Sequence, residues 1–354
     1  MGSEMIFSVY YISSYAVMRH IVLSIITLVL SGVCICCSAL YPPPDIPLTL
    51  YSSGTSPEKG DCILILAGDI MLSRHIERLS RIRNDYLHPF RKVTPLLLSG
   101  DITFANLETP LCEGDTPLRG LHFRADPGFA SAMKKSGITL LSLANNHILD
   151  WKKPGADNTL QSLYRAGIGT VGFNKKGFTG TPYFTDIRGI TVAFLAFTDC
   201  INAVPLTQYS EMGILLYGNN PSFIDAVKTA RHKADCVIVS LHWGSEYGNN
   251  PLSQQVTLAR AAIDAGADII IGHHPHVLQR YEHYRNGHIF YSLGNFVFDQ
   301  KAREATRRSA VIRVIVTHNG ISRIDAVPVF INDVYQPITA GPDKAREIYK
   351  ALKK

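Results

Sequence analysis

The chain has 354 residues, of which 46% are hydrophobic and 18% charged, and its formal net charge is +6. These values are typical of a folded globular protein and exclude a disordered chain. The basic residues form no dense cluster interleaved with aromatic residues, so nucleic acid is not an expected partner. A mild positive charge of this kind is compatible with an acidic polymer or an acidic surface as partner.

Residues 21–40 (IVLSIITLVLSGVCICCSAL) carry no charge, follow Arg19-His20 and precede three prolines. Twenty apolar residues can span a bilayer as a helix, and a basic flank followed by an apolar core and small residues also fits a secretory signal. We therefore expect residues 1–40 to be a signal peptide or a membrane-anchor helix. Either would place the rest of the protein on the extracytoplasmic face of the membrane or in the periplasm.

Residues 41–60 are rich in Pro, Ser and Gly, which predicts a linker. Residues 61–335 alternate apolar strands with helices and predict one α/β domain, and residues 336–354 predict a tail with a helix. Continuous apolar runs such as ILIL (63–66) indicate strands buried on both faces. The expected strands are 62–67, 102–105, 138–143, 190–197, 236–241, 268–271 and 288–292, with a hairpin of 310–316 and 323–330. The expected helices are 73–83, 127–135, 157–166, 222–233 and 253–265.

Side chains that bind metals follow five of these strands at the point where each strand ends. The clearest case is Gly272-His273-His274-Pro275-His276, which comes directly after three isoleucines. Ligands in open α/β sheets bind outside the carboxyl ends of the strands, and neutral imidazole is a common ligand of catalytic transition metals. The predicted ligands are Asp69, Asn106, Glu108, Asn146, His242, His274 and His276. Oxygen and nitrogen donors without thiolate suit Mn, Zn or Fe, as one or two ions.

Each of these features also has an ordinary structural explanation. Gly68-Asp69 could form a turn, and Asn145-Asn146 could cap a helix with His147 incidental to it. His242 could be a buried histidine beside a core tryptophan, and Glu108 could pair with an arginine. All of these explanations would have to hold at the same end of every strand, so we favour a metal centre.

Six sequence blocks in order resemble one known family over residues 61–335. They are Gly68-Asp69-Ile70-Met71-Leu72, Asn106-Leu107-Glu108-Thr109-Pro110-Leu111, Leu143-Ala144-Asn145-Asn146-His147 with Asp150, His242-Trp243-Gly244-Ser245-Glu246-Tyr247, Gly272-His273-His274-Pro275-His276-Val277 and Tyr291-Ser292-Leu293-Gly294-Asn295-Phe296-Val297-Phe298. These blocks resemble the bacterial CapA family of capsule or poly-γ-glutamate synthesis proteins. That family in turn resembles the calcineurin-like metallophosphoesterases, which implies a four-layer α/β/β/α sandwich with a two-metal centre.

The resemblance also implies a role for individual residues. Asp69 matches the first metal-binding aspartate, and Asn106 or Glu108 falls at the position of the bridging carboxylate. Asn146 matches the metal-binding asparagine and His147 the catalytic histidine beside it. His242 matches the isolated histidine ligand, and His274 with His276 the closing His-x-His pair. Two departures are that Met71 stands where those enzymes have a histidine and that Asn106-Leu107-Glu108 replaces the bridging aspartate.

The resemblance favours a membrane-associated, metal-dependent hydrolase-like protein of capsule or poly-γ-glutamate-type polymer production. In this hypothesis His147 donates a proton to the leaving group, and Arg74 and Arg124 hold an anionic polymer or a phosphorylated small substrate. Both arginines are equally compatible with solvated surface charges. A non-catalytic assembly or export subunit of a polymer-synthesis complex, which uses the same fold for binding, is the alternative, because fold alone does not decide function.

Overall fold

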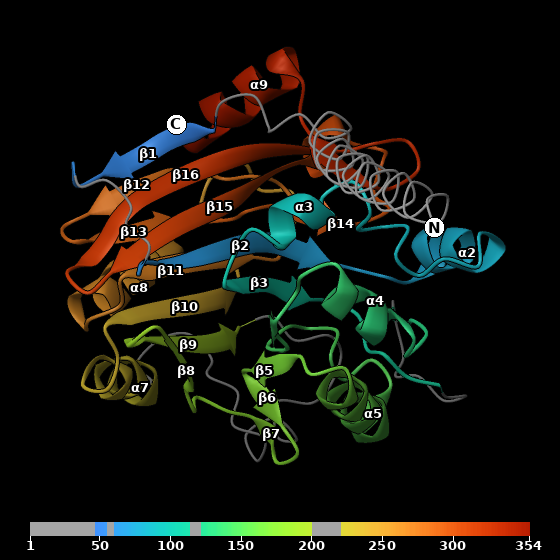
Figure 1. Cartoon of the computed structure of the whole chain (residues 1–354), viewed down its shortest axis with the longest axis horizontal. Helices are drawn as coiled ribbons and strands as arrows, with labels where there is room; N and C mark the ends of the chain where they lie inside the picture. Colours follow the sequence, from blue (N-terminus) through green and yellow to red (C-terminus); the bar gives the residue numbers. More distant parts are fainter. Residues whose placement is uncertain (1–46, 55–59, 114–121, 200–220) are drawn as a thin grey trace, which may run out of the picture. The chain divides into compact units, whose positions relative to one another are not determined.

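A computed structural model describes residues 47–54, 60–113, 122–199 and 221–354 (Figure 1). These residues belong to one compact unit that begins at Pro47. The predicted signal or anchor segment, residues 1–40, lies outside the described residues. Within the part of the chain that is described, no helix is long and apolar enough to cross a membrane.

The larger of two main sheets is parallel at its centre and antiparallel on one side. Its order is β1 (Leu48–Ser52), β16 (Gly320–Ile331), β15 (Arg308–Thr317), β2 (Cys62–Ile70), β3 (Ile102–Leu107), β4 (Leu140–Ser142) and β5 (Gly169–Val171). Strand β14 (Asn295–Val297) pairs with β2, and β17 (Pro337–Thr339) with β16. Strands β2 to β5 run parallel, whereas β15, β16 and β1 are antiparallel to their neighbours.

The smaller sheet also has a parallel centre. Its order is β12 (Tyr281–Tyr284), β13 (Gly287–Phe290), β11 (Ile269–His273), β10 (Cys236–His242), β9 (Ile190–Thr198) and β8 (Tyr183–Ile187). Strands β9, β10, β11 and β13 run parallel, and the two edge strands are antiparallel. A separate short ribbon pairs β6 (Phe173–Asn174) with β7 (Gly177–Phe178).

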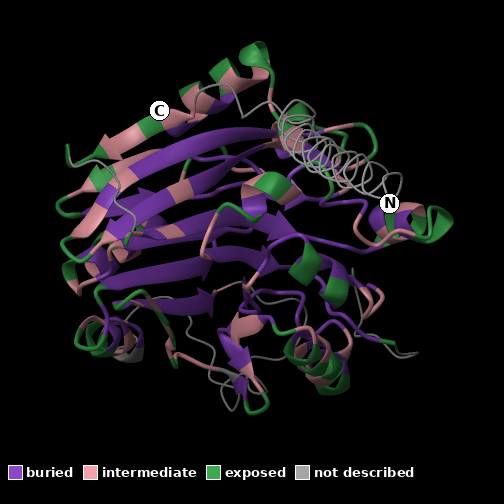
Figure 2. Ribbon diagram, in the orientation of Figure 1, coloured by how far each residue is buried: buried purple, intermediate pink, exposed green. Residues whose placement is uncertain are grey.

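Helices cover the outer face of each sheet. They are α2 (Arg74–Ile82), α3 (Thr94–Leu97), α4 (Phe129–Lys135) and α5 (Lys152–Arg165) beside the larger sheet, and α7 (Pro221–Arg231) and α8 (Ser253–Asp264) beside the smaller one. Helix α9 (Pro342–Leu352) packs on the core between the sheets, and a short 3₁₀ helix, η1 (Glu304–Arg307), precedes β15. Figure 2 shows the strands as mostly buried, while exposed residues gather on the helices and loops.

The burial of alternate residues explains why this sequence forms four layers. Successive side chains of a strand point to opposite faces. In β10, Ile238 packs into the core between the sheets, whereas Val237 and Val239 pack against α7 and α8. In β2, Leu64 faces the smaller sheet and Ile65 faces the helices of the larger one. The predicted α/β/β/α sandwich is confirmed.

The structure departs from the sequence prediction at both ends of the domain and at one helix. The predicted linker contains β1, which pairs with β16 and is fixed by a hydrogen bond from Thr49 Oγ1 to Asp325 Oδ1 (2.8 Å). The tail predicted from residue 336 contains β17 as well as the expected helix, so the sheet extends beyond 61–335 on both sides. Helix α5 begins at Lys152 instead of residue 157, because Pro154 lies in its first turn, where a backbone N–H is not needed.

Candidate metal centre

The carboxyl ends of the parallel strands of both sheets meet at one edge of the sandwich. In Figure 1 the arrowheads of β2, β3, β9 and β10 point to the same side. In the larger sheet Asp69 pairs in register with Asn106 and with Asn295, and in the smaller sheet His242 pairs with His273. The predicted ligands therefore reach one place because their strands end there.

Two glycines allow the backbones to approach closely at this edge. A Cβ atom on Gly68 would lie 2.0 Å from the carbonyl oxygen of Gly294, and a Cβ on Gly272 would lie 1.8 Å from that of Tyr291. Real side chains cannot occupy such positions, so only glycine fits. Each of these glycines directly precedes a residue of the centre, Asp69 or His273.

Asp69 is held from three sides. Its Oδ1 accepts a hydrogen bond from Asn106 Nδ2 (2.8 Å) and lies 2.9 Å from His273 Nδ1, and its Oδ2 accepts the backbone N–H of His274 (3.2 Å). The side chains of Asp69 and His273 are fully buried. Buried groups of this kind are stable only when their hydrogen bonds are satisfied, so this network joins the two sheets and fixes the orientation of the Asp69 carboxylate.

The carboxylate of Glu108 is surrounded by histidines of the site. Its Oε1 is 3.8 Å from His147 Nε2 and 3.7 Å from His276 Nε2, and its side chain is fully buried. Three overlapping sets of donor atoms lie within 4.8 Å of one another, namely Glu108, His242 and His274; Asp69, Glu108 and His276; and Glu246, His274 and His276. The structure thus brings together Asp69, Glu108 and three of the predicted histidines.

The histidines of the centre are held by their neighbours and by unusual backbone. His242 Nε2 lies 2.9 Å from Asn146 Oδ1, and His276 Nδ1 lies 3.0 Å from Asn295 Oδ1. The backbone φ is +91° at His274 and +58° at His276, in the left-handed region that residues with a Cβ rarely adopt. Such backbone strain is concentrated at functional sites, where the surrounding structure maintains it.

Burial and neighbouring groups shift the pKa values of the two carboxyl groups of the centre, those of Glu108 and Asp69. Burial, followed by the nearby charges of Asp69, Glu246 and Asp150, raises the pKa of Glu108 well above its ordinary value. Burial acts in the same direction on Asp69, but its hydrogen bonds to His273 and Asn106 hold its pKa below the ordinary value. Hydrogen bonds from the protein therefore stabilise the negative charge of Asp69, whereas Glu108 receives none among the described residues.

Burial favours the neutral form of three of the imidazoles, those of His242, His274 and His276. It lowers the pKa of His274 and that of His276 to about 4, and it lowers the pKa of His242 well below its ordinary value, with the neighbouring histidines adding to the effect. Neutral imidazole is the form that binds a metal.

The unsatisfied atoms at this place fit a cation. Both carboxylate oxygens of Glu108, Nδ1 of His274 and Nε2 of His273 are buried without a hydrogen-bond partner among the described residues. An unpaired buried carboxylate is unfavourable by several kcal/mol, and buried polar atoms normally find partners. A donor set of carboxylate and imidazole suits a divalent transition metal, with Glu108, His242, His274, His276 and Asp69 as the residues that would hold it.

His147 lies at the border of the centre. Its Nδ1 is 2.7 Å from Asp150 Oδ2, and its ring stacks on Phe123 with 4.0 Å between ring centroids. Asp150 Oδ2 also accepts the backbone N–H of Phe123 (2.6 Å). His147 is thus paired with Asp150 on its Nδ1 side. That contact turns the other ring nitrogen, Nε2, toward Glu108.

The family model described as bacterial capsule synthesis protein PGA_cap matches residues 63–300. The capsule biosynthesis protein CapA of Bacillus anthracis is 37% identical over 305 residues, which cover 82% of this chain and 72% of that protein. This chain belongs to the PGA_cap family. The PGA biosynthesis protein CapA of Bacillus subtilis is 33% identical over 81% of this chain and 76% of its own length.

The PGA_cap family belongs to the metallophosphoesterase-like superfamily. Among solved structures, the sulfate thiohydrolase SoxB of Thermus thermophilus aligns with 84% of this chain and 61% of its own chain, at a TM-score of 0.44 and 12% identity. The assignment of the fold therefore rests on the four layers described above and on membership of the PGA_cap family.

Two predicted ligands of this PGA_cap protein make contacts that compete with metal binding. Asn106 donates from Nδ2 to Asp69, and its Oδ1 accepts a hydrogen bond from Asn145 Nδ2 (3.1 Å). Asn146 Oδ1 contacts His242. In this arrangement both amides position other residues of the centre, and their role as ligands stays a prediction.

Arg74 and Arg124, the two arginines predicted to bind substrate, have different neighbours. The guanidinium of Arg74 forms an ion pair with Asp299 and lies 4.9 Å from the ring centroid of Phe123. That of Arg124 lies 4.8 Å from the ring centroid of Trp151. Arg74 is thus beside the ring that stacks on His147, and the substrate role of both residues stays a prediction.

Three further residues of the centre, His273, Asn295 and Glu246, are not among the ligands predicted from the sequence. His273 lies on the same face of β11 as Ile269 and Ile271, which face the other sheet, so the two-residue period of the strand was a signal for it. Asn295 and Glu246 stand in the motif blocks, but nothing in their spacing indicates that Asn295 contacts His276 or that Glu246 lies near His274.

Proposed function

We propose that this chain is an extracytoplasmic, membrane-associated, metal-dependent hydrolase-like protein that acts in the production of a capsular or poly-γ-glutamate-type polymer. The observation that supports it most is the buried Glu108 carboxylate, which has no hydrogen-bond partner among the described residues and lies among neutral imidazoles. Membership of the PGA_cap family supports the role in polymer production.

The chemistry proposed for the site divides between a metal and the chain's own residues. A divalent transition metal held by Glu108 and the histidines would act as a Lewis acid on a phosphoryl or acyl centre and make water more acidic. Asp150 holds the Nδ1 side of His147, which leaves Nε2 turned toward the centre. In this proposal Nε2 of His147 donates a proton to the leaving group while the bond between the leaving group and the phosphoryl or acyl centre breaks. The buried rings of Phe123 and Phe298 pack edge to face beside His147.

We expect His147→Gln to reduce hydrolysis by about 100-fold or more, because general acid catalysis contributes on that order, while metal content and melting temperature stay close to wild type. The assay follows the chain length of poly-γ-glutamate and, in parallel, the release of phenol from diphenyl phosphate, whose leaving group benefits from a proton donor, by the full chain loaded with Mn²⁺ or Zn²⁺. Arg165→Gln, at an exposed position in the last turn of α5, is the surface control and should keep the activity, metal content and melting temperature of wild type.

Loss of the metal in His147→Gln would make His147 a ligand and contradict its proposed role as acid. A wild-type chain that binds a stoichiometric metal but hydrolyses neither substrate would favour the non-catalytic assembly subunit instead.

The proposed location depends on residues 1–40, which lie outside the described part of the chain. A fusion of residues 18–60 to a reporter that is active only outside the cytoplasm should give full signal, because the apolar segment 21–40 follows a basic flank. A silent reporter at normal expression would contradict export. The same fusion with two charged residues placed within 21–40 is the control and should give no signal.

A further inference from the structure

A hollow of about 590 Å³ opens beside the candidate metal centre, and we call it the basic cleft. Its lining includes Arg74, His75, Tyr247, Asp299, Lys301 and Arg303. Cavities of roughly 300–1,000 Å³ hold ligands of drug size, so this one is larger than a single carboxylate or phosphate needs.

One wall of the basic cleft connects to the centre through hydrogen bonds. His276 Nδ1 contacts Asn295 Oδ1 (3.0 Å), Asn295 Nδ2 donates to Gln300 Oε1 (3.1 Å), and Gln300 Nε2 donates to the hydroxyl of Tyr247 (3.2 Å). The ring of Tyr247 lies 6.1 Å from that of His276, centroid to centroid. A bound molecule that contacts Tyr247 would therefore lie close to His276, which is a predicted metal ligand.

The other wall connects to His147. Arg74 lies over the ring of Phe123, and Phe123 stacks on His147. Arg74 and His75 both contact Asp299, whose side chain is only 3% exposed. Asp299 is the carboxylate in the lining of the cleft, and these two neighbours already engage it.

Two cations of the lining have no carboxylate partner in the described part of the chain. The guanidinium of Arg303 lies 4.6 Å from the ring centroid of Tyr247, and the ammonium of Lys301 lies 4.0 Å from that of Tyr335. Lys301 also donates to the backbone carbonyl of Asp333. Aromatic faces hold cations in place without neutralising their charge, so the cleft keeps a positive potential.

We propose that Arg303 and Lys301 are the specificity-determining residues of this cleft and bind the carboxylates of a polyanionic chain of the poly-γ-glutamate type. Each cation rests on its own aromatic ring and the two do not share a partner, which suits successive charges of an extended chain better than one compact anion. The proposal deepens the proposed function and rests on it, because the cleft would deliver the chain to the centre between His276 and His147.

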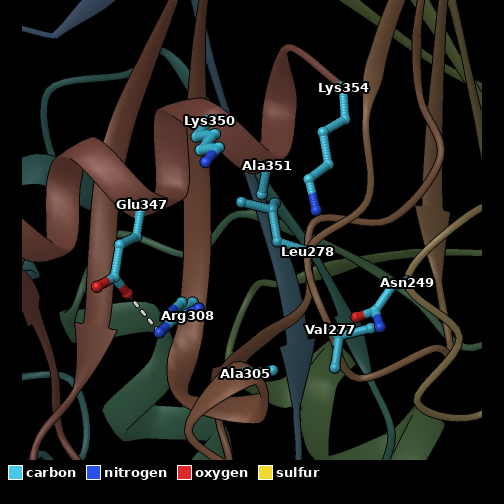
Figure 3. A pocket seen from close by; sticks show the side chains of 9 residues that line it. All are labelled: Asn249, Val277, Leu278, Ala305, Arg308, Glu347, Lys350, Ala351 and Lys354. Atoms are coloured by element: carbon cyan, nitrogen blue, oxygen red, sulfur yellow. Dashed lines mark ion pairs between the residues drawn. The ribbon is translucent and has the colours of Figure 1, made fainter.

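A second hollow contains a lysine whose substitution controls for the loss of one positive charge outside the basic cleft. It has a volume of about 220 Å³ and lies between α9 and the segment that follows His276 (Figure 3). Figure 3 shows Arg308 of this hollow in an ion pair with Glu347 and places Lys350 on α9. Because Arg308 is also paired with Glu304, this hollow already contains its own counter-charges. Lys350→Gln therefore removes one exposed positive charge away from the basic cleft.

The test measures binding of fluorescently labelled poly-γ-glutamate to the full chain by anisotropy at constant ionic strength. We expect Arg303→Gln and Lys301→Gln each to weaken binding about 3- to 5-fold, as for single exposed ion pairs, and the double variant to weaken it about 10-fold or more. Arg303→Lys should keep most of the affinity. Lys350→Gln should stay within about two-fold of wild type, because it leaves the cleft intact.

Equal losses in the Lys350→Gln and Arg303→Gln variants would overturn the proposal, since binding would then follow net charge alone. Tighter binding of a polyphosphate of similar length than of poly-γ-glutamate would overturn the ligand class. If the variants show the expected binding pattern but the wild-type chain hydrolyses no substrate, the proposed function is contradicted. The proposal that the basic cleft binds the polymer then still holds. All five variants change exposed side chains, and their melting temperatures verify that each one folds.

Discussion

Glu108→Gln is expected to weaken the binding of divalent metal by about 100-fold or more, since even substitutions beyond the ligands themselves cost 10- to 100-fold. The amide removes the negative charge but keeps the shape of the side chain. Because the Glu108 carboxylate is buried and unpaired, the metal-free variant should melt at the same temperature as the metal-free wild type or higher. Titration calorimetry with Mn²⁺ or Zn²⁺ and thermal melts in EDTA measure the two effects.

Asp268→Asn is the matched control, because Asp268 directly precedes β11 while the metal centre lies at the other end of that strand. Asp268 Oδ2 accepts hydrogen bonds from Arg231 and from the backbone N–H of Val237. Its substitution should therefore lower stability by about 1–3 kcal/mol and leave metal affinity unchanged. If Glu108→Gln instead lowered stability and kept full metal affinity, Glu108 would be a structural residue.

Gly272→Ala is expected to destabilise the protein by about 3 kcal/mol or more, or to prevent folding. The new methyl group would lie 1.8 Å from the carbonyl oxygen of Tyr291 and 2.7 Å from Trp243 Nε1. Those two atoms share a hydrogen bond of 3.0 Å, which the methyl group would also disrupt. Denaturant unfolding of wild type and variant, both in EDTA, measures the difference.

Gly60→Ala is the control for this substitution, because a Cβ at Gly60 has no atom of the described residues within 4 Å. It should change stability by less than about 0.5 kcal/mol. A Gly272→Ala protein with the stability of Gly60→Ala would mean that β11 and the segment after β13 are not packed as closely as described.

The location of the centre could be predicted because it depends on local order along the chain. Each apolar run predicts a strand, and the residue type that follows marks its carboxyl end. Parallel strands then gather these ends at one edge. Asp69, Glu108 and His242 could be assigned to one site in this way, although they are far apart in sequence.

The contacts within the centre could not be predicted, because they depend on how two separate sheets pack together. The hydrogen bond between His273 and Asp69 joins residues 204 positions apart. The same applies to Arg303 and Lys301, whose positions beside aromatic rings follow from the path of the segment between β14 and β15. Nothing in the local sequence around either cation indicates an anion-binding role.

The strand within residues 41–60 could not be predicted for a related reason. Pro, Ser and Gly in residues 41–60 indicate a linker, but five residues within it add a strand to an edge that β16 would otherwise expose. An edge strand is stabilised by its partner's hydrogen bonds, so its own composition is a weak signal.

The most direct test is a crystal structure of residues 47–354 grown with Mn²⁺ or Zn²⁺, with data collected at the absorption edge of the metal. We predict an anomalous peak among Glu108, His242 and His274, at roughly 2.0–2.2 Å from a Glu108 oxygen and from the imidazole nitrogens if the metal is zinc. Anomalous peaks confined to surface histidines, with Glu108 bound by protein groups alone, would contradict the central claim that this edge of the sandwich is a metal centre.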